Sequence, residues 1–296
     1  MAKPTIANVA ELAGVSQATV SRALRGATNV TEETRIKVQR AADQLNFTLS
    51  KSASALASGK TMRVILLVSG KLNEWFNSGV LQGVYEELAP VGYDVTPAFI
   101  TDRSELDRFF SQLPKSRNAD AIIISSFQLM PAMRDQLQAI DLPTVGVNVP
   151  AESGYFDASI SIDNSNAMTM AVRLLRSLGH TNIAFCSDYI PADMVYNTSQ
   201  RTQAFADAAQ ANATDGITFS LLTADAHDAP LSKSDLASQL TAKLLSLPER
   251  PTAVCVETDQ VAIALVKELR KQQLNVPEDI SVLGFDDAEI AQAADL

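Results

Sequence analysis

Residues 5–26 read TIANVAELAGVSQATVSRALRG, and the spacing of their apolar side chains predicts two short helices joined by a tight turn. Thr5 and Ser16 stand where N-caps are expected, because a side-chain oxygen there accepts hydrogen bonds from free helix N–H groups. Gly14 lies between the helices, where the turn needs a positive φ. Gly26 is placed to end the second helix. The stretch is therefore typical of a helix-turn-helix motif.

The second helix of this motif presents small and polar side chains outward, while Val20 and Leu24 face inward. In a helix-turn-helix, the N-terminal end of the second helix meets base edges in the major groove of DNA. An ordinary helical hairpin with a polar surface is the alternative, but the turn, the caps and the inward residues all agree with DNA binding. The head residues that we predict to contact DNA are Thr5, Ser16, Gln17, Ala18, Thr19, Ser21, Arg22 and Asn29.

A third helix is expected from its N-cap Thr31 to about Asn46, and it completes a head of residues 1–46. Its apolar positions are Ile36, Val38, Ala41, Ala42 and Leu45. Residues 1–60 hold eight Lys or Arg against four Asp or Glu, whereas residues 61–296 hold 16 against 30. The cations are thus concentrated where DNA phosphates would be met, although the whole chain has a net charge of −10.

Residues 47–61 form a predicted hinge that is rich in Ser, Ala and Lys and poor in large apolar side chains. The segment could be a flexible linker, or a short helix that forms only on DNA. Leu56 favours the second interpretation, since an isolated apolar side chain there suits a wedge between base steps of the minor groove. We predict that Lys51, Ser54 and Leu56 contact DNA.

From Arg63 onward, short Val- and Ile-rich runs alternate with amphipathic segments, which predicts a body of residues 62–296 with parallel sheets covered on both faces. The predicted strands are 63–69, 94–100, 120–125, 143–148, 158–163, 182–187, 217–222, 252–256 and 280–284, and predicted helices include 77–89, 130–140, 165–178, 234–246 and 259–272. Ligands of such sheets bind beyond the carboxyl ends of the strands. Polar residues that follow each strand are therefore the candidates for a binding site.

Composition argues against several classes of protein. The longest aliphatic run, residues 64–68, is too short to cross a bilayer, and the N-terminus carries no signal-peptide core. Cys186 and Cys255 lie in apolar runs and are expected to be buried free thiols in a reducing cytoplasm. His180 and His227 are expected to be structural or solvated. We therefore predict no metal site and no cofactor.

The main alternative is an enzyme tethered to DNA by the head, and a periplasmic-type sugar-binding protein is the second. None of the twelve glycines forms a G-x-G pair, and the G-x-S-x-G, H-E-x-x-H and C-x-x-C motifs do not occur. The sequence therefore gives an enzyme little support, and the head argues against a periplasmic protein.

Six segments together resemble the lactose-repressor (LacI/GalR) family of transcriptional repressors. They are VAELAGVSQATVSRAL in the head, LNEWF at 72–76, IDNSNAM at 162–168, LRSLGHTNIAF at 175–185, RTQAF at 201–205 and LNVPEDISVLGFDD at 274–287. The resemblance implies a body of two doubly wound α/β subdomains of periplasmic-binding-protein type, with three crossovers and a small effector in the cleft between them. It also implies a homodimer on a near-palindromic operator.

The resemblance assigns a ligand-binding role to Arg201 and a hydroxyl-binding role to Asp286. Trp75 or Phe76 could stack on a sugar or base ring, although both could instead pack in the core. Asp163 and Asn164 are expected to cap the next helix. The predicted effector-binding residues are Trp75, Phe76, Ser125, Asn148, Arg201, Thr258 and Asp286. Such a set favours a saccharide, acting as inducer or as co-repressor.

The sequence departs from the family at several positions. Asn8 stands where an acidic residue is usual, and Thr258 replaces a usual Asn of the binding site. In the hinge, Leu49 and Ser50 replace a usual Pro-Asn, and Ser54 replaces an Arg or Gln. These changes predict a less rigid hinge with one DNA contact fewer. The sequence also stops soon after GFDD, so we expect either a fragment or an incompletely closed body.

Overall fold

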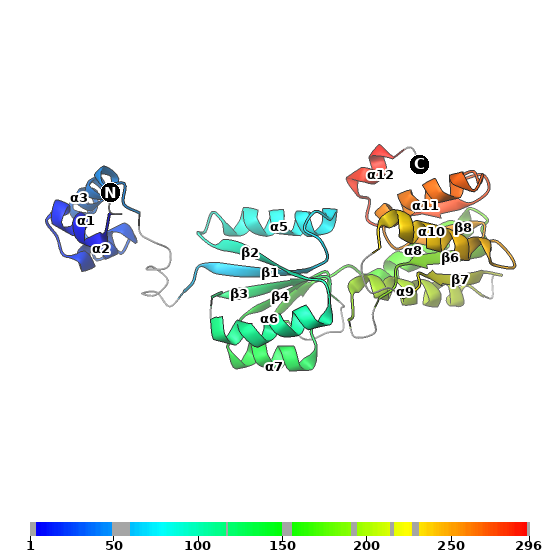
Figure 1. The fold of residues 1–296 in the computed structure, drawn as a ribbon, viewed down its shortest axis with the longest axis horizontal. Coiled ribbons are helices and arrows are strands. Elements are labelled where there is room, and N and C mark those ends of the chain that lie inside the picture. Colours follow the sequence, from blue (N-terminus) through cyan, green and yellow to red (C-terminus); the bar gives the residue numbers. More distant parts are fainter. Residues whose placement is uncertain are drawn as a thin grey trace.

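The computed structural model describes residues 4–48, 60–116, 118–149, 156–190, 194–213, 216–226 and 231–294. A helical head precedes two α/β subdomains that follow one another along the long axis of Figure 1. The predicted fold class, a helix-turn-helix head with a body of two parallel sheets, is confirmed. The helices and strands predicted from the sequence are all present, with ends that differ by at most a few residues.

The head consists of helices α1 (Ile6–Ala13), α2 (Gln17–Leu24) and α3 (Glu32–Gln44). Thr5 caps α1 as predicted, and its own backbone N–H donates to the side chain of Asn8 at 3.0 Å. Asn8 therefore replaces the usual acidic residue in a capping box. Gly14 adopts φ +66°, and the fully buried Val20 packs where α1, α2 and α3 meet.

Ile36 does not face the core of the head. Its side chain is 44% exposed, whereas Val38 on the same helix is fully buried. Successive helical residues are rotated by about 100°, so residues two apart lie on nearly opposite sides of a helix. Ile36 therefore lies outside the inward face of α3, which Val38, Ala41 and Ala42 form.

The first subdomain, here the N-subdomain, contains a parallel sheet of strand order β2-β1-β3-β4-β5. Its elements are β1 (Arg63–Ser69), α5 (Trp75–Leu88), β2 (Asp94–Ile100), α6 (Arg103–Ser116), β3 (Ala121–Ser125), α7 (Pro131–Ala139), β4 (Thr144–Val147) and β5 (Ala158–Ile160). Figure 1 shows α5 on one face of this sheet and α6 with α7 on the other. Ile65 and Leu67 of β1 pack beneath α6 and α7, as the alternation of side chains along a strand requires.

The second subdomain, the C-subdomain, contains a parallel sheet of strand order β7-β6-β8-β9. Its elements are α8 (Asn164–Ser177), β6 (Asn182–Ser187), α9 (Asn197–Ala211), β7 (Thr218–Thr223), α10 (Lys233–Leu245), β8 (Ala253–Val256), α11 (Asp259–Lys271), β9 (Ser281–Leu283) and α12 (Glu289–Ala293). Ile183 and Phe185 of β6 pack against α8 and α9, while Ala184 and Cys186 pack against α10 and α11.

Cys186 and Cys255 are free and buried, as predicted. They belong to the apolar clusters on opposite faces of the C-subdomain sheet. Burial raises the pKa of both thiols, so neither is a reactive thiolate at neutral pH.

The two subdomains are joined by backbone contacts near the carboxyl ends of β3 and β6. Phe127 forms an isolated antiparallel bridge with Tyr196, which precedes α9. The N–H of Gln128 donates to the carbonyl of Val195 at 2.8 Å, and the N–H of Asn197 donates to the carbonyl of Ser126 at 3.0 Å. These bonds tie the start of α9 to the N-subdomain, at the edge where the strands of both sheets end.

The turn at Gly14 gives a direct test of the motif. A Cβ added to this glycine would meet no atom within 4 Å, so any cost of substitution arises from the positive φ alone. We expect Gly14→Ala to lower the free energy of unfolding of the head by about 1 kcal/mol, and Gly14→Asn to cost less. Amide hydrogen exchange of α1 and α2 in the full chain measures this difference. Equal protection in Gly14→Ala and the parent would contradict it.

Candidate functional site

A cavity of about 290 Å³, here called the cleft, lies where the carboxyl ends of the two sheets face each other. The N-subdomain contributes the ends of β1 and β4 and the start of α5. The C-subdomain contributes the residues after β6, β8 and β9 together with the start of α9. This is the position at which parallel α/β sheets bind ligands.

A second cavity, of about 460 Å³, lies at the other end of the N-subdomain sheet, where β4 begins. Arg134, Asp141 and Asp157 are among its lining residues. No residue at the carboxyl end of a strand lines it, so the cleft is the better candidate for a binding site, although the cleft has the smaller volume.

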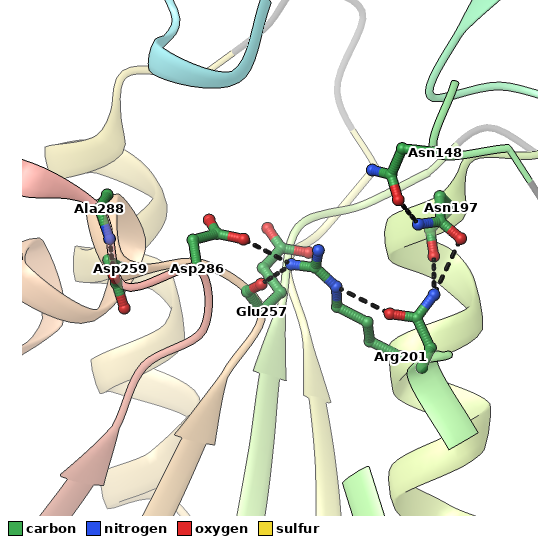
Figure 2. A network of polar contacts seen from close by, with 8 residues as sticks. Asn148, Asn197, Arg201, Glu257, Asp259, Asp286 and Ala288 are labelled. Atoms are coloured by element: carbon green, nitrogen blue, oxygen red, sulfur yellow. Dashed lines mark hydrogen bonds and ion pairs between the residues drawn. The ribbon is translucent and has the colours of Figure 1, made fainter. Parts of the chain in front are cut away.

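Arg201 of α9 is the central charge of the cleft, with only 3% of its surface exposed. Its Nη1 donates to the carbonyl oxygen of Glu257 and lies 3.4 Å from Oδ1 of Asp286 (Figure 2). The guanidinium carbon also lies 3.7 Å from the centre of the Phe285 ring. The guanidinium is thus held by a carbonyl, a carboxylate and an aromatic face.

Burial shifts the ionisation of the acids around Arg201. The pKa of Asp286 is raised to about 6, because burial and the negative charge of Asp259 outweigh the attraction of Arg201 and a hydrogen bond from Trp75. Burial also raises the pKa of Glu257 to about 7, and the nearby charge of Asp188 adds to this. Asp286 is consequently ionised at neutral pH and can accept hydrogen bonds from a ligand.

A chain of buried amides links Arg201 to the N-subdomain. Nε of Arg201 donates to Oδ1 of Asn164 at 3.3 Å, and Nδ2 of Asn164 donates to Oδ1 of Asn197 at 2.8 Å. Nδ2 of Asn197 then donates to Oδ1 of Asn148, which follows β4 (Figure 2). Direct hydrogen bonds between side chains therefore connect the two sides of the cleft.

Trp75 and Phe76 are the first two residues of α5 and both line the cleft. Their ring centres are 5.7 Å apart in an edge-to-face arrangement. The side chain of Trp75 is available for stacking, because the residue is 40% exposed. The interpretation of both rings as core residues is thus not supported.

Six of the seven predicted effector residues line the same cavity: Trp75, Phe76, Asn148, Arg201, Thr258 and Asp286. Ser125 does not line it. As the last residue of β3, Ser125 is fully buried, whereas the next residue, Ser126, lines the cleft with φ +72°. Asp163 caps α8 as predicted, through the N–H of Asn166 at 2.9 Å.

The sequence interpretation missed several residues of the cleft. Asp188 and Glu257 directly follow β6 and β8, so the rule of strand ends could have found them. Asn197 and Tyr196 lie at the start of α9, and Lys233 at the start of α10, where the sequence carries no such signal. Asn164 was expected only as a cap, but its side chain is part of the amide chain.

The exposed surface of α2 carries several of the predicted DNA contacts of the head. Gln17, Ala18 and Arg22 are exposed, and Arg22 lies 3.5 Å from the hydroxyl of Thr19. Thr5 and Ser16 are caps, Thr19 and Ser21 are half-buried, and Asn29 is exposed. The predictions for Lys51, Ser54 and Leu56, as well as that for His227, concern residues outside the described part of the chain.

In the described part of the chain, every helix is too short or too polar to traverse a lipid bilayer. Across the same residues, His, Cys, Asp and Glu form no group of three or more that could hold a metal ion.

Comparison with known proteins agrees with both the head and the body. Residues 5–50 match the family model "Bacterial regulatory proteins, lacI family", and residues 172–296 match "Periplasmic binding protein-like domain". The transcriptional repressor PurR of Vibrio cholerae is 31% identical over 291 residues, which is 97% of this chain and 83% of that protein. Catabolite control protein A of Priestia megaterium is 26% identical and covers the same shares.

Solved structures show the same fold. The Lac repressor dimer bound to operator and the anti-inducer ONPF matches 99% of this chain and 85% of its own, with a TM-score of 0.81 at 23% identity. The transcriptional regulator CelR in complex with cellobiose matches 98% of this chain and 85% of its own, with a TM-score of 0.62 at 27% identity. From its helix-turn-helix head, its two-subdomain body and these similarities, the chain belongs to the lacI family of bacterial regulatory proteins.

Proposed function

We propose that this protein is a sequence-specific transcriptional repressor, and that a small neutral saccharide in the cleft controls its affinity for operator DNA. The observation that carries the proposal is one chain holding both an exposed recognition surface on α2 and a polar cleft between two subdomains. Its relatives are transcriptional regulators, and we propose no catalytic activity. A DNA-bound repressor acts in the cytoplasm, which also sets it apart from a periplasmic sugar-binding protein.

The charge of the cleft favours a neutral effector. Four carboxyl groups line it, from Glu74, Asp188, Glu257 and Asp286, against the two cations Arg201 and Lys233. Even with Glu257 partly protonated at neutral pH, the acidic groups outnumber the cations. Because Arg201 is already paired with Asp286, little positive charge remains for a phosphate. Carboxylate and amide oxygens accept hydrogen bonds from sugar hydroxyls, and an exposed aromatic ring can cover a sugar face.

A purine is the second candidate, because PurR of Vibrio cholerae is a relative and the Trp75–Phe76 pair could also stack on a base. Among the similar solved structures, CelR was found with cellobiose and a regulator from Lactobacillus casei with glucose. The acidic lining and the buried arginine–carboxylate pair are better suited to several hydroxyl groups than to a flat base.

The effector acts through the angle between the subdomains. Ligands in the cleft touch both sheets, so they favour one arrangement of the two subdomains over another. We propose that the arrangement favoured by the saccharide disfavours operator binding, which makes it an inducer. Linkage then requires operator DNA to weaken saccharide binding by the same factor.

Base reading by α2 can be tested at Arg22. An exposed arginine in the major groove binds O6 and N7 of guanine, with Gln17 expected on a nearby base and Ala18 on a thymine methyl. Arg22→Ala should weaken operator binding by about 1–3 kcal/mol and relax the preference at one position per half-site. Selection from random DNA measures this. Arg40→Ala, on α3, removes an equal charge and should keep the consensus; an unchanged consensus in Arg22→Ala would refute the assignment.

Saccharide binding should depend on pH through Asp286. Its ionised carboxylate accepts hydroxyl hydrogen bonds, so affinity is complete well above the pKa of about 6 and falls towards tenfold per unit below it. Asp286→Asn should cost about 2 kcal/mol, since it removes a charged acceptor and the partner of Arg201.

Calorimetry against glucose, cellobiose, their phosphates and hypoxanthine, with and without operator, is the measurement. Asp207→Asn, an exposed carboxylate on α9, is the control for loss of charge. If hypoxanthine is the one compound that binds, the effector is a purine and not a saccharide. If a ligand binds equally well with and without operator, it does not control DNA binding, and this part of the proposal is contradicted.

The apolar, little-buried helix α5 should form a two-fold dimer contact. Among its residues only Asn77 is buried, Tyr85 is 59% exposed, and a Cβ on Gly83 would meet no atom within 4 Å. Gly83→Glu should therefore fold normally but place a charge in the interface, at a cost of about 3 kcal/mol or more to the dimer. Sedimentation velocity should show monomers for Gly83→Glu and dimers for the control Gly83→Ala. A dimer of unchanged stability in Gly83→Glu would place the interface elsewhere.

A further inference from the structure

The loop that carries Asp286 has an unusual backbone. Residues 284–288 connect β9 to α12, and within them Asp286 adopts φ +115° and Asp287 adopts φ +52°. Residues with a Cβ rarely occupy this region, and they remain there only when the surrounding structure holds them. The contacts that hold this loop therefore decide where the carboxylate of Asp286 points.

Asp259 makes those contacts from the first turn of α11. Its backbone N–H donates to the carbonyl of Phe285 at 2.8 Å, and its Oδ2 accepts from the N–H of Ala288 at 2.8 Å. The two bonds fall on either side of Asp286 and Asp287. In Figure 2, Asp259 and Ala288 lie on the side of Asp286 away from Arg201.

Gly284 shows how closely Asp259 fits the loop. A Cβ on this glycine would lie 2.1 Å from Oδ1 of Asp259, which no side chain tolerates. The glycine thus leaves room for the carboxylate of Asp259 against the loop backbone. Asp259 is itself 7% exposed, and it does not belong to the lining of the cleft, although its neighbours Thr258 and Gln260 do.

We propose that Asp259 is a positioning residue, which clamps residues 284–288 so that the carboxylate of Asp286 faces Arg201 and the cleft. The proposal rests on the proposed function in one respect, since it takes Asp286 to bind the effector. The clamp itself is a property of the unliganded protein and can be measured without knowing the effector.

Asp259 also acts on Asp286 through its charge. Three side chains from other elements act on Asp286: Arg201 from α9, Asp259 from α11 and Trp75 from α5. Glu257 also lies nearby, because its carbonyl accepts a hydrogen bond from the same Nη1 of Arg201. Asp287 is the neighbour of Asp286 in the loop. Of these, Asp259 raises the pKa of Asp286, while Arg201 and Trp75 lower it. An Asn at position 259 keeps an acceptor for Ala288 but removes the charge, so it separates geometry from electrostatics.

The single tryptophan of the chain reports on Asp286 directly. Trp75 is the only tryptophan in the sequence; it lines the cleft together with Asp286, and its side chain lowers the pKa of that carboxyl. Fluorescence of the full-length protein, titrated from pH 8 to pH 4, should therefore show a transition near pH 6. Asp286→Asn should abolish this transition, and Glu257→Gln separates it from the titration of Glu257 near pH 7.

Two substitutions then test the clamp. Asp259→Asn should move the transition to lower pH by about 1 unit, because a like charge is lost while the loop stays in place. Asp259→Ala should free the loop and abolish the tryptophan transition, with circular dichroism of the fold unchanged. Asp235→Asn, in the first turn of α10, is the matched control and should leave the transition where it is.

Calorimetry with cellobiose and glucose completes the test. Asp259→Asn should bind as the parent does at pH 8, and Asp259→Ala at least tenfold more weakly. A parent-like transition in both Asp259 variants would overturn the proposal. If the transitions shift as expected but Asp286→Asn binds every sugar and purine as the parent does, the clamp stands and the effector role of Asp286 fails.

Discussion

The arrangement of the cleft depends on keeping one guanidinium charge inside the protein. Arg201 is almost fully buried, and an unpaired charge there would cost several kcal/mol. The carbonyl of Glu257, the carboxylate of Asp286, the amide of Asn164 and the ring of Phe285 all lie around it. These groups come from the residue that follows β8, from α8 and from the loop after β9. The buried charge therefore fixes how three separate parts of the C-subdomain meet at the end of the sheet.

The same constraint extends to the N-subdomain through the amide chain. Asn164 hydrogen-bonds both Arg201 and Asn197, and Asn197 in turn hydrogen-bonds Asn148 on the other side of the cleft. A rotation of the subdomains that separates Asn197 from Asn148 leaves buried amides without partners, unless water or a ligand replaces them. Intermediate angles are thus disfavoured, and a cleft of this kind has discrete arrangements that a ligand can select.

Local signals explain why the head was predictable and the interior of the cleft was not. Thr5, Gly14 and Ser16 act on their immediate neighbours, so their roles follow from spacing alone. The parallel sheets and most cleft residues followed from the alternation of strands and helices and from the family resemblance. Ser125 lies outside the lining of the cleft, because a shift of one residue at a strand end changes which side chain faces the cavity. The partners of Asn164 and Asp259 are 33 and 29 residues away in the chain, and only tertiary structure determines them.

The polar groups that an effector meets in this cleft already form hydrogen bonds and an ion pair with one another. Arg201 and Asp286 are paired before a ligand arrives, and Arg201 also donates to the carbonyl of Glu257. A sugar hydroxyl therefore exchanges one hydrogen bond for another, and the net gain in binding free energy at these groups is small. What the ligand gains decisively is contact with both subdomains in only one of their arrangements. The polar residues of the cleft thus provide recognition, while the difference in contacts between the two arrangements provides the control of DNA binding.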